Sequence, residues 1–383
     1  MRKVKAAVIG AGFIGQAHIE AVRRTGLAEV TAIVQSSQDK AEALARKLHI
    51  PKAYGDFQDV LRDPDIEVVH NCTPNHLHYE INKQILQHGK HLLSEKPLTM
   101  TSEEARELYQ LSREKELVTG INFNYRQFPM VQQFRQMVQN KELGVPRLVR
   151  GHYLQDWLMY ETDYNWRMEP AYGGQTRAIG DIGSHLYDLS QYVTGKRITE
   201  VFADLATIIP QRYKPVREVQ SFQTSSTSEM QAVDVETEDY CTVLAKFEDG
   251  SRGVLTVSQI SAGKKNGLEL ALDGSLASAS WNQEEPFRLK VGYRDQPSSI
   301  IVRDPALVDQ EVQSYVHYPG GHEEGWPDSL KNMMNHFYAA VLGDQQNRHA
   351  VASFQEGYQL MLLIDAIVES GKSGKWVKVK QES

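Results

Sequence analysis

Residues 8–15 have the sequence Val8-Ile9-Gly10-Ala11-Gly12-Phe13-Ile14-Gly15, which carries the clearest indication of the fold class. Its three glycines, spaced Gly-x-Gly-x-x-Gly, stand between a short apolar run and a segment with helical periodicity. Gly10 permits a tight turn, Gly12 lets the backbone approach a pyrophosphate, and Gly15 allows close packing of helix on strand. The pattern predicts a dinucleotide site in which the amides at the helix start, at Phe13 and Ile14, face the phosphates.

The sequence around this stretch alternates between short β-branched runs and helical segments as far as residue 122. The runs are continuously apolar, which is typical of parallel strands covered on both faces. We expect strands at 4–9, 30–34, 66–71, 91–94 and 118–121, and helices at 13–25, 40–48, 76–88 and 102–115. This part is predicted to be an α/β Rossmann domain over residues 1–125, with a parallel sheet and helices on both of its faces.

The character of the sequence then changes to strands with period-two alternation. We expect strands at 147–154, 240–248, 253–261, 268–273 and 277–282, helices at 129–141, 328–342 and 354–370, and a polar loop at 223–229. Residues 126–383 are therefore predicted to form an α+β domain with a large, mostly antiparallel open sheet.

Composition excludes several classes of protein. The chain has 383 residues, of which 41% are hydrophobic and 24% charged, and 42 Lys and Arg against 49 Asp and Glu give a net charge of −7. Without a basic patch, nucleic acid is not an expected partner. No apolar run approaches the roughly 20 residues that cross a bilayer, so we expect no membrane association. The two cysteines, Cys72 and Cys241, are too few for a disulfide framework, which indicates a cytoplasmic protein.

The residues that follow the second expected strand bear on the choice of cofactor. An acidic residue there would bind the ribose 2′-hydroxyl of NAD. Glu29 lies before this strand, and the strand is followed instead by Gln35-Ser36-Ser37 and then by Lys40. Since no carboxylate would repel a 2′-phosphate, the sequence leaves NAD and NADP as alternatives.

Three segments directly follow expected strands and should line one crevice at the carboxyl edge of the sheet. They are Thr73-Pro74-Asn75-His76, Glu95-Lys96-Pro97 and the segment 122–126, which contains Asn124. We expect these residues to contact the cofactor. His76 and His78 resemble a pair of metal ligands, but zinc needs three or four ligands and no third accompanies them, so no metal is predicted.

A second set of polar residues lies in Asp181-Ile182-Gly183-Ser184-His185-x-x-Asp188, before an amphipathic segment that ends near Gly195. In a helix, the spacing of four puts Asp181 and His185 on one face. A carboxylate beside an imidazole can orient it for proton transfer.

Together these motifs resemble the Gfo/Idh/MocA family of oxidoreductases over nearly the whole chain. The resemblance implies that Lys96 and His185 are catalytic, that Asp181 is a substrate or support residue, and that the chain assembles as a homodimer or homotetramer through the C-terminal sheet. Segments similar to the substrate pockets of family members are Tyr125-Arg126, Trp166-Arg167 and the stretch around His322. The chain departs from the commonest family pattern at residues 173–178, before Asp181.

The resulting hypothesis is an NAD- or NADP-dependent oxidation of a secondary hydroxyl of a sugar, anhydrosugar or cyclitol. His185 takes the hydroxyl proton and the Lys96 ammonium stabilises the alkoxide that develops. Two alternatives are a non-catalytic nucleotide sensor of the same fold and, because the glycine turn is shared, an S-adenosylmethionine-dependent methyltransferase.

Overall fold

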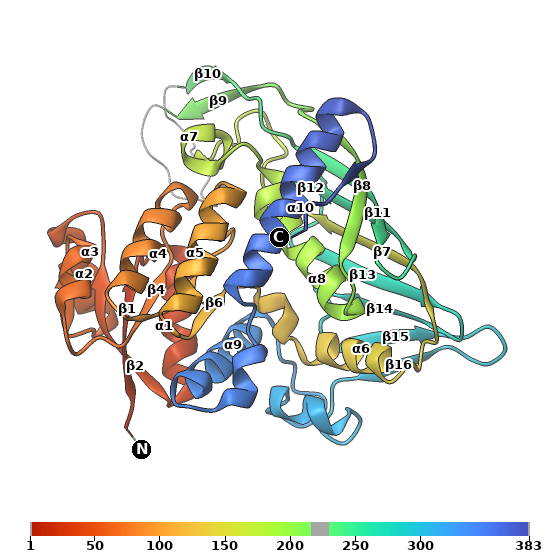
Figure 1. Ribbon diagram of the computed structural model, residues 1–383, viewed down its shortest axis with the longest axis horizontal. Helices are drawn as coiled ribbons and strands as arrows, with labels where there is room; N and C mark the ends of the chain where they lie inside the picture. Colours follow the sequence, from red (N-terminus) through yellow and green to blue (C-terminus); the bar gives the residue numbers. More distant parts are fainter. Residues whose placement is uncertain (1, 216–229, 382–383) are drawn as a thin grey trace. The chain divides into compact units, whose positions relative to one another are not determined.

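The computed structural model describes residues 2–215 and 230–381, so the polar loop expected at 223–229 lies outside the described residues. The chain divides into two compact units (Figure 1). Unit 1 comprises Met1–Phe128 and Glu324–Met361, and unit 2 comprises Pro129–Glu323 and Leu362–Ser383. The two domains expected at 1–125 and 126–383 stay a prediction, and unit 1 includes a late segment that those boundaries give to the second domain.

Unit 1 is built on a six-stranded parallel sheet in the order β3-β2-β1-β4-β5-β6. Its elements are β1 Val4–Ile9, α1 Phe13–Thr25, β2 Ala28–Val34, α2 Gln38–Leu48, β3 Lys52–Tyr54, α3 Phe57–Arg62, β4 Val68–Asn71, η1 Asn75–Leu77, α4 His78–Gln87, β5 His91–Ser94, α5 Ser102–Glu114, β6 Thr119–Ile121, η2 Asn124–Gln127, α9 Trp326–Val341 and η6 Gln345–His349.

The strand order of unit 1 reverses direction after β1, and this reversal determines where ligands bind. Right-handed crossovers place α1 and α2 on one face of the sheet and α4 and α5 on the other. The helix α9 packs against α1 and extends the core on that side. In such a sheet the crevice lies at the carboxyl ends of the strands where the order reverses, between β1 and β4.

Unit 2 contains a nine-stranded sheet in the order β16-β15-β14-β13-β7-β12-β11-β8-β17, in which all described pairs are antiparallel except β7 with β12. Its elements are α6 Pro129–Gln139, β7 Pro146–Leu154, η3 Trp166–Met168, α7 Pro170–Gly173, η4 Ile179–Gly183, α8 Ser184–Thr194, β8 Ile198–Ala206, β9 Gln211–Pro215, β10 Met230–Asp234, β11 Tyr240–Phe247, β12 Arg252–Ser258, β13 Gly267–Gly274, β14 Ser278–Asn282, β15 Arg288–Gly292, β16 Ser299–Val302, η5 Gln310–Tyr315 and β17 Val377–Lys378. The helix α10 Phe354–Ser373 belongs to both units.

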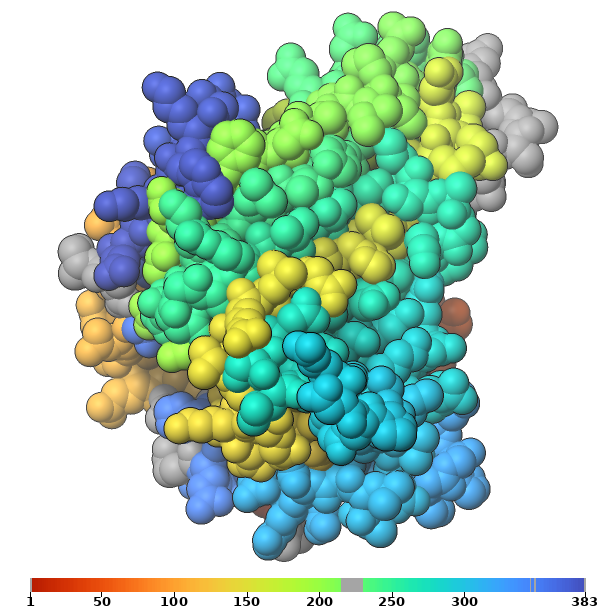
Figure 2. All heavy atoms as spheres, turned by 90° about the vertical axis from the view of Figure 1, so that its right-hand side faces the viewer, coloured from red at the N-terminus to blue at the C-terminus, as the bar shows by residue number. Residues whose placement is uncertain are grey.

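The two faces of this sheet differ. Helices α6 and α8 pack against β7, β13, β14 and β15, and burial alternates along strands such as β11. The side chains on the other face form the surface toward the viewer in Figure 2, with β7 in yellow among green and teal strands. One face is thus covered by helices, and strand side chains form the surface of the other.

The predicted fold class is confirmed in both halves. The structure adds elements that the sequence analysis did not predict: β3 and α3 in unit 1, and β8, β9, β10, β15, β16 and β17 in unit 2. Within the described ranges, no helix combines the length and apolar character that a bilayer crossing requires.

Candidate active site

The glycine turn between β1 and α1 has the geometry of a dinucleotide corner. Gly10 has a φ of +80°, and a Cβ there would lie 2.7 Å from the carbonyl oxygen of Cys72. A Cβ on Gly15 would lie 2.5 Å from the carbonyl oxygen of Gly10, whereas one on Gly12 would meet nothing within 4 Å. Gly10 and Gly15 are therefore required by packing, and Gly12 faces open space that a side chain would fill.

The start of α1 suits an anion. No described side chain caps this helix, and its first turn contains no acidic residue. Since the first amides of a helix have no partner within it, an anion placed at this end can accept their hydrogen bonds and is favoured by the helix dipole. This corner therefore fits the pyrophosphate of a dinucleotide.

The residues expected near the ribose lie together after β2. The side chain of Ser37 accepts a hydrogen bond from the amide of Lys40 at 3.4 Å and caps α2, and the Lys40 ammonium donates to the Ser36 hydroxyl at 3.3 Å. The amide of Gln35 donates to the carbonyl of Tyr54 on β3 at 3.2 Å. In the register of β1 with β2, Glu29 lies opposite Lys5. This position is near the start of β2, at the end of the strand away from the Ser36, Ser37 and Lys40 cluster.

The strand-end segments after β4, β5 and β6 lie along one edge of the sheet, because these strands are direct neighbours. His78 links two of the segments, since its ring nitrogens lie 2.8 Å from the carbonyl oxygen of Thr73 and 2.7 Å from that of Pro97. Its buried ring therefore holds the turns together. Among residues 2–215 and 230–381, no group of three histidine, cysteine or carboxylate side chains could hold a metal ion.

Glu95 fixes the turn from which Lys96 projects. One carboxylate oxygen lies 3.0 Å from Nε2 of His18 and also accepts from the amide of Asn122, and the other accepts from the backbone amide of Lys96 at 3.2 Å. Burial by itself would raise the pKa of Glu95, but hydrogen bonds from His18 and Asn122 and the nearby positive charges lower it to about 2. Glu95 is therefore ionised under all ordinary conditions.

The network continues away from Glu95. Nδ1 of His18 lies 3.0 Å from Nδ1 of His70, and Nε2 of His70 lies 2.6 Å from the hydroxyl of Tyr338 on α9. The pKa of His70 is held well below its usual range by burial and by His18. The sequence motifs did not single out these three residues. The available signal was His18, three residues after Gly15 on the buried face of α1.

Asp181 and His185 in unit 2 lie at the junction of two helical segments. Asp181 is in η4, which is a π-helical turn, and His185 is buried in the first turn of α8. One Asp181 oxygen lies 3.4 Å from Nε of Arg167, and the other accepts from the amide of Gln259 at 2.9 Å. Asp181 is therefore oriented by two side chains from other elements of its unit.

A buried carboxyl supports this helical junction. Glu238 accepts hydrogen bonds from the backbone amides of Arg177 and Ile179 at 2.9 and 2.8 Å. Burial raises the pKa of Glu238 to about 7, although these amides and Arg177 oppose the rise. The next residue, Asp239, forms buried ion pairs with the guanidinium groups of Arg177 and Arg212.

The remaining predicted pocket residues have varied surroundings. The Arg167 guanidinium lies over the Trp166 ring at 4.5 Å. The Arg126 guanidinium is buried and paired with Glu356 at 2.6 Å, and Tyr125 is buried. His322 is exposed. All the predicted site assignments, including the meeting of Lys96 with His185, stay predictions.

Comparisons with known proteins place the chain in a family. Residues 4–123 match the model described as oxidoreductase family, NAD-binding Rossmann fold, and residues 131–280 match the GFO/IDH/MocA C-terminal domain. Levoglucosan dehydrogenase of Pseudarthrobacter phenanthrenivorans is 29% identical, with all of both chains covered. 1,5-Anhydro-D-fructose reductase of Ensifer adhaerens is 33% identical over 51% of this chain and 58% of its own.

Solved structures agree with this placement. A structure of levoglucosan dehydrogenase in complex with NADH and levoglucosan superposes with a TM-score of 0.88 at 27% identity, covering 99% of this chain and all of that one. The predicted nicotinamide dinucleotide cofactor and oxidoreductase class are confirmed by the family, which disfavours a methyltransferase. The chain belongs to the Gfo/Idh/MocA family of NAD-dependent oxidoreductases that act on CH–OH groups.

Proposed function

We propose that this chain uses NAD to oxidise a secondary hydroxyl of a sugar, an anhydrosugar or a cyclitol. The observation that carries the proposal is the similarity to levoglucosan dehydrogenase along the entire length of both chains. Levoglucosan is therefore the first substrate to test, followed by inositols and aldoses.

In the proposed reaction, Lys96 of unit 1 and the pair Asp181 and His185 of unit 2 act on the same substrate. Bound nicotinamide supplies the acceptor for the hydride that leaves the carbinol carbon. His185 takes the hydroxyl proton, so that the alcohol loses a hydride and a proton and becomes a ketone. The ammonium of Lys96 stabilises the charge that develops on the same oxygen. Asp181, held by Arg167 and Gln259, accepts a hydrogen bond from a substrate hydroxyl.

Turnover of two variants tests this assignment. A positioned general base contributes roughly 10² to 10⁴ in rate, and the loss of one group that stabilises a developing oxyanion costs roughly 10² to 10³. His185→Ala and Lys96→Ala should therefore each lower turnover at least about 100-fold. Their affinity for NADH, measured by fluorescence titration, should change little. Lys47→Ala and His88→Ala, at exposed positions outside the site, are the matched controls. Wild-type turnover in either site variant would refute the assignment.

Titration with both reduced cofactors tests the choice of NAD. We expect NADH to bind more tightly than NADPH. The Ser36 hydroxyl and the Lys40 ammonium are the groups available to a 2′-phosphate. Lys40→Ala should therefore weaken NADPH binding selectively. Tighter binding of NADPH by the wild type would make NADP the cofactor.

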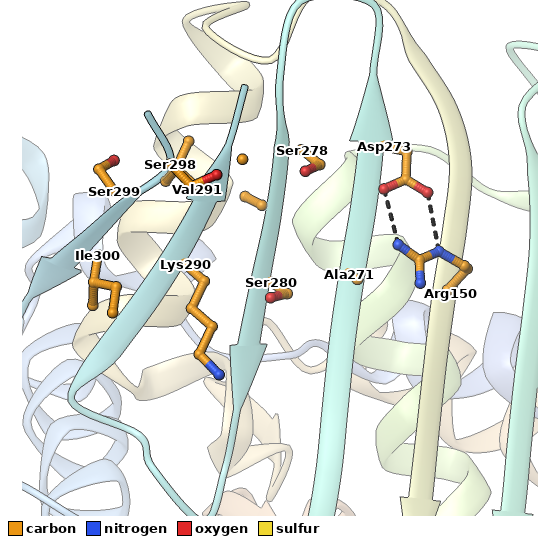
Figure 3. Close-up of a pocket in the computed structure, with 12 residues that line it drawn as sticks. Arg150, Ala271, Asp273, Ser278, Ser280, Lys290, Val291, Ser298, Ser299 and Ile300 are labelled. Carbon is orange, nitrogen blue, oxygen red and sulfur yellow. Dashed lines mark hydrogen bonds and ion pairs between the residues drawn. The ribbon is translucent and has the colours of Figure 1, made fainter. Parts of the chain in front are cut away.

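We propose that two or four copies assemble through the outer face of the nine-stranded sheet. Leu244, Val254 and Ile300 are exposed apolar side chains of this sheet. The same face has a hollow of about 440 Å³ (Figure 3). Arg150 and Asp273, which form a bidentate ion pair, line it. A second copy of the sheet would remove this surface from water.

Light scattering measures this assembly directly. The chain mass is 43.4 kDa, and we expect two or four times that value. The double variant Leu244→Lys with Val254→Lys should shift the mass toward the monomer, because it would bury charge in the contact. A monomeric wild type would contradict the assembly.

A nucleotide sensor without catalysis is the remaining alternative. It predicts tight NADH binding together with no hydride transfer across the whole polyol panel. The same titration and activity screen therefore separate the two functions.

A further inference from the structure

Two aromatic rings from distant parts of the sequence stack beside the dinucleotide corner. Phe13 is the first residue of α1 and Trp326 the first residue of α9, and both belong to unit 1. Their ring centroids lie 6.1 Å apart with an interplanar angle of 17°. The Phe13 residue is nevertheless 66% exposed to water.

The first turn of α9 is attached to α1, so Trp326 has a defined position. The Arg24 guanidinium donates to the carbonyl oxygen of Pro327 at 3.2 Å and forms an ion pair with Asp328. The other oxygen of Asp328 accepts from the amide of Gly325 at 2.8 Å and caps the helix. The indole therefore rests on a helix end that is fixed by capping and by Arg24.

The rings border the place where a pyrophosphate must lie. Phe13 directly follows Gly12, whose missing side chain leaves open space, and it stands at the helix start where an anion binds. A large aromatic side chain left mostly in water at such a point has apolar surface that a ligand can cover. The flat apolar faces of the two rings suit a ribose of an extended dinucleotide, whose C–H groups can pack on them beside the phosphates.

We propose that Phe13 and Trp326 form an aromatic wall of the dinucleotide site, which a bound cofactor covers. This inference rests on the proposed NAD-dependent function. The wall excludes water from one side of the phosphates, and hydrogen bonds between the phosphates and the backbone amides are stronger when water is excluded. Loss of the wall should mainly speed cofactor release.

Tryptophan fluorescence tests the inference without measuring activity. The other four tryptophans, Trp157, Trp166, Trp281 and Trp376, belong to unit 2. Trp326→Phe keeps an aromatic ring and should bind NADH within about twofold of wild type, while losing a distinct part of the emission change that NADH causes. Trp376→Phe is the matched control: this indole lies against Phe202 of the nine-stranded sheet, and its loss should leave that change intact.

Removal of the ring tests its contribution to affinity. Trp326→Ala should bind NADH about threefold to tenfold more weakly, which is the size expected for one aromatic contact. Stopped-flow mixing should show faster release, and circular dichroism should show an unchanged fold. If Trp326→Ala does not fold, Phe13→Leu replaces it, with the same expected direction.

The outcomes separate the wall from the function. If the wild type binds no dinucleotide, the proposed function and the wall both fail. If the wild type binds NADH but Trp326→Phe gives the full wild-type emission change, or Trp326→Ala binds NADH as wild type does, only the wall is refuted.

Discussion

A buried glutamate holds the turn that carries Lys96 in unit 1, and another holds the helical junction that carries Asp181 in unit 2. The pKa values of these two glutamates are shifted in opposite directions. Glu95 accepts from His18 and Asn122, and its pKa falls to about 2. Glu238 accepts from the backbone amides of Arg177 and Ile179, and burial raises its pKa to about 7. At Glu95, the side-chain donors and the nearby positive charge outweigh the cost of burying a carboxylate. At Glu238, the two backbone amides do not outweigh that cost.

The largest expected effect lies in the ionic cluster next to Glu238. Asp239→Asn would leave the buried guanidinium groups of Arg177 and Arg212 without their carboxylate, which costs about 3–5 kcal/mol for a broken buried pair. Urea unfolding measures the loss. Asp59→Asn, which removes the exposed partner of Arg62 on α3, is the control and should cost less than about 1 kcal/mol. Equal losses would show that burial does not govern these pairs.

The next effect concerns the turn of unit 1. Glu95→Gln should lower the free energy of unfolding by about 1–3 kcal/mol, because donors are left with a weaker acceptor. Turnover should fall at least about tenfold, since the Lys96 turn shifts. Glu107→Gln on the exposed side of α5 is the control. An unchanged turnover would remove Glu95 from the positioning of Lys96.

The sign of the pH dependence follows from the lowered pKa. The contribution of ionised Glu95 to stability is complete above its ordinary pKa of 4.5 and is lost as pH falls toward about 2. Wild type and Glu95→Gln should therefore converge in stability only in that acid range.

The contribution of Glu238 to the free energy of unfolding should depend on pH in the opposite direction and by a smaller amount. Its pKa is raised, so its stabilising contribution is complete below pH 4.5 and is lost as pH rises through about 7. Glu238→Gln keeps an oxygen that accepts from both amides and never ionises. We expect its stability to vary less between pH 5 and 8 and to exceed wild type by about 1 kcal/mol at pH 8. Parallel stability curves would contradict the raised pKa.

The smallest expected effect compares one thiol in each unit. Burial raises the pKa of Cys72 and of Cys241, so both thiols stay protonated and shielded from solvent. Neither should react with an alkylating reagent in the native protein. In rising urea, mass spectrometry of the labelled peptides should show which unit opens first. Rapid native labelling of either thiol would contradict its burial.

The sequence predicted those elements whose patterns are local. The strand Val4–Ile9 and the helix Phe13–Thr25 have the bounds expected, because a buried apolar run, three glycines and helical periodicity are contained in 22 residues. The three-residue strand β3 is only partly buried and carries too few residues for a period. The exposed edge strand β16 shows no alternation that would mark it.

The π-helical turn at Asp181 illustrates what local patterns do not contain. The spacing of four puts Asp181 and His185 on one face if a regular helix has begun by Asp181. The structure instead has Ile179–Gly183 as a π-helical turn, and the amides of Arg177 and Ile179 bond to Glu238. That carboxyl comes about 60 residues later in the chain, so no nearby residue signals it.

Local patterns in the sequence were enough to predict the class of fold and the family, because the glycines and strand-end motifs act through their own backbone geometry. The support of the chemistry-bearing segments, by contrast, comes from contacts that exist only in the folded chain. His18 contacts His70, and His70 contacts Tyr338, which lies 268 positions later in the chain. Trp326 likewise stacks on Phe13 from the C-terminal part of the chain. Burial, and with it the charge state of Glu95 and Glu238, follows from folding distant segments together, which no local pattern encodes.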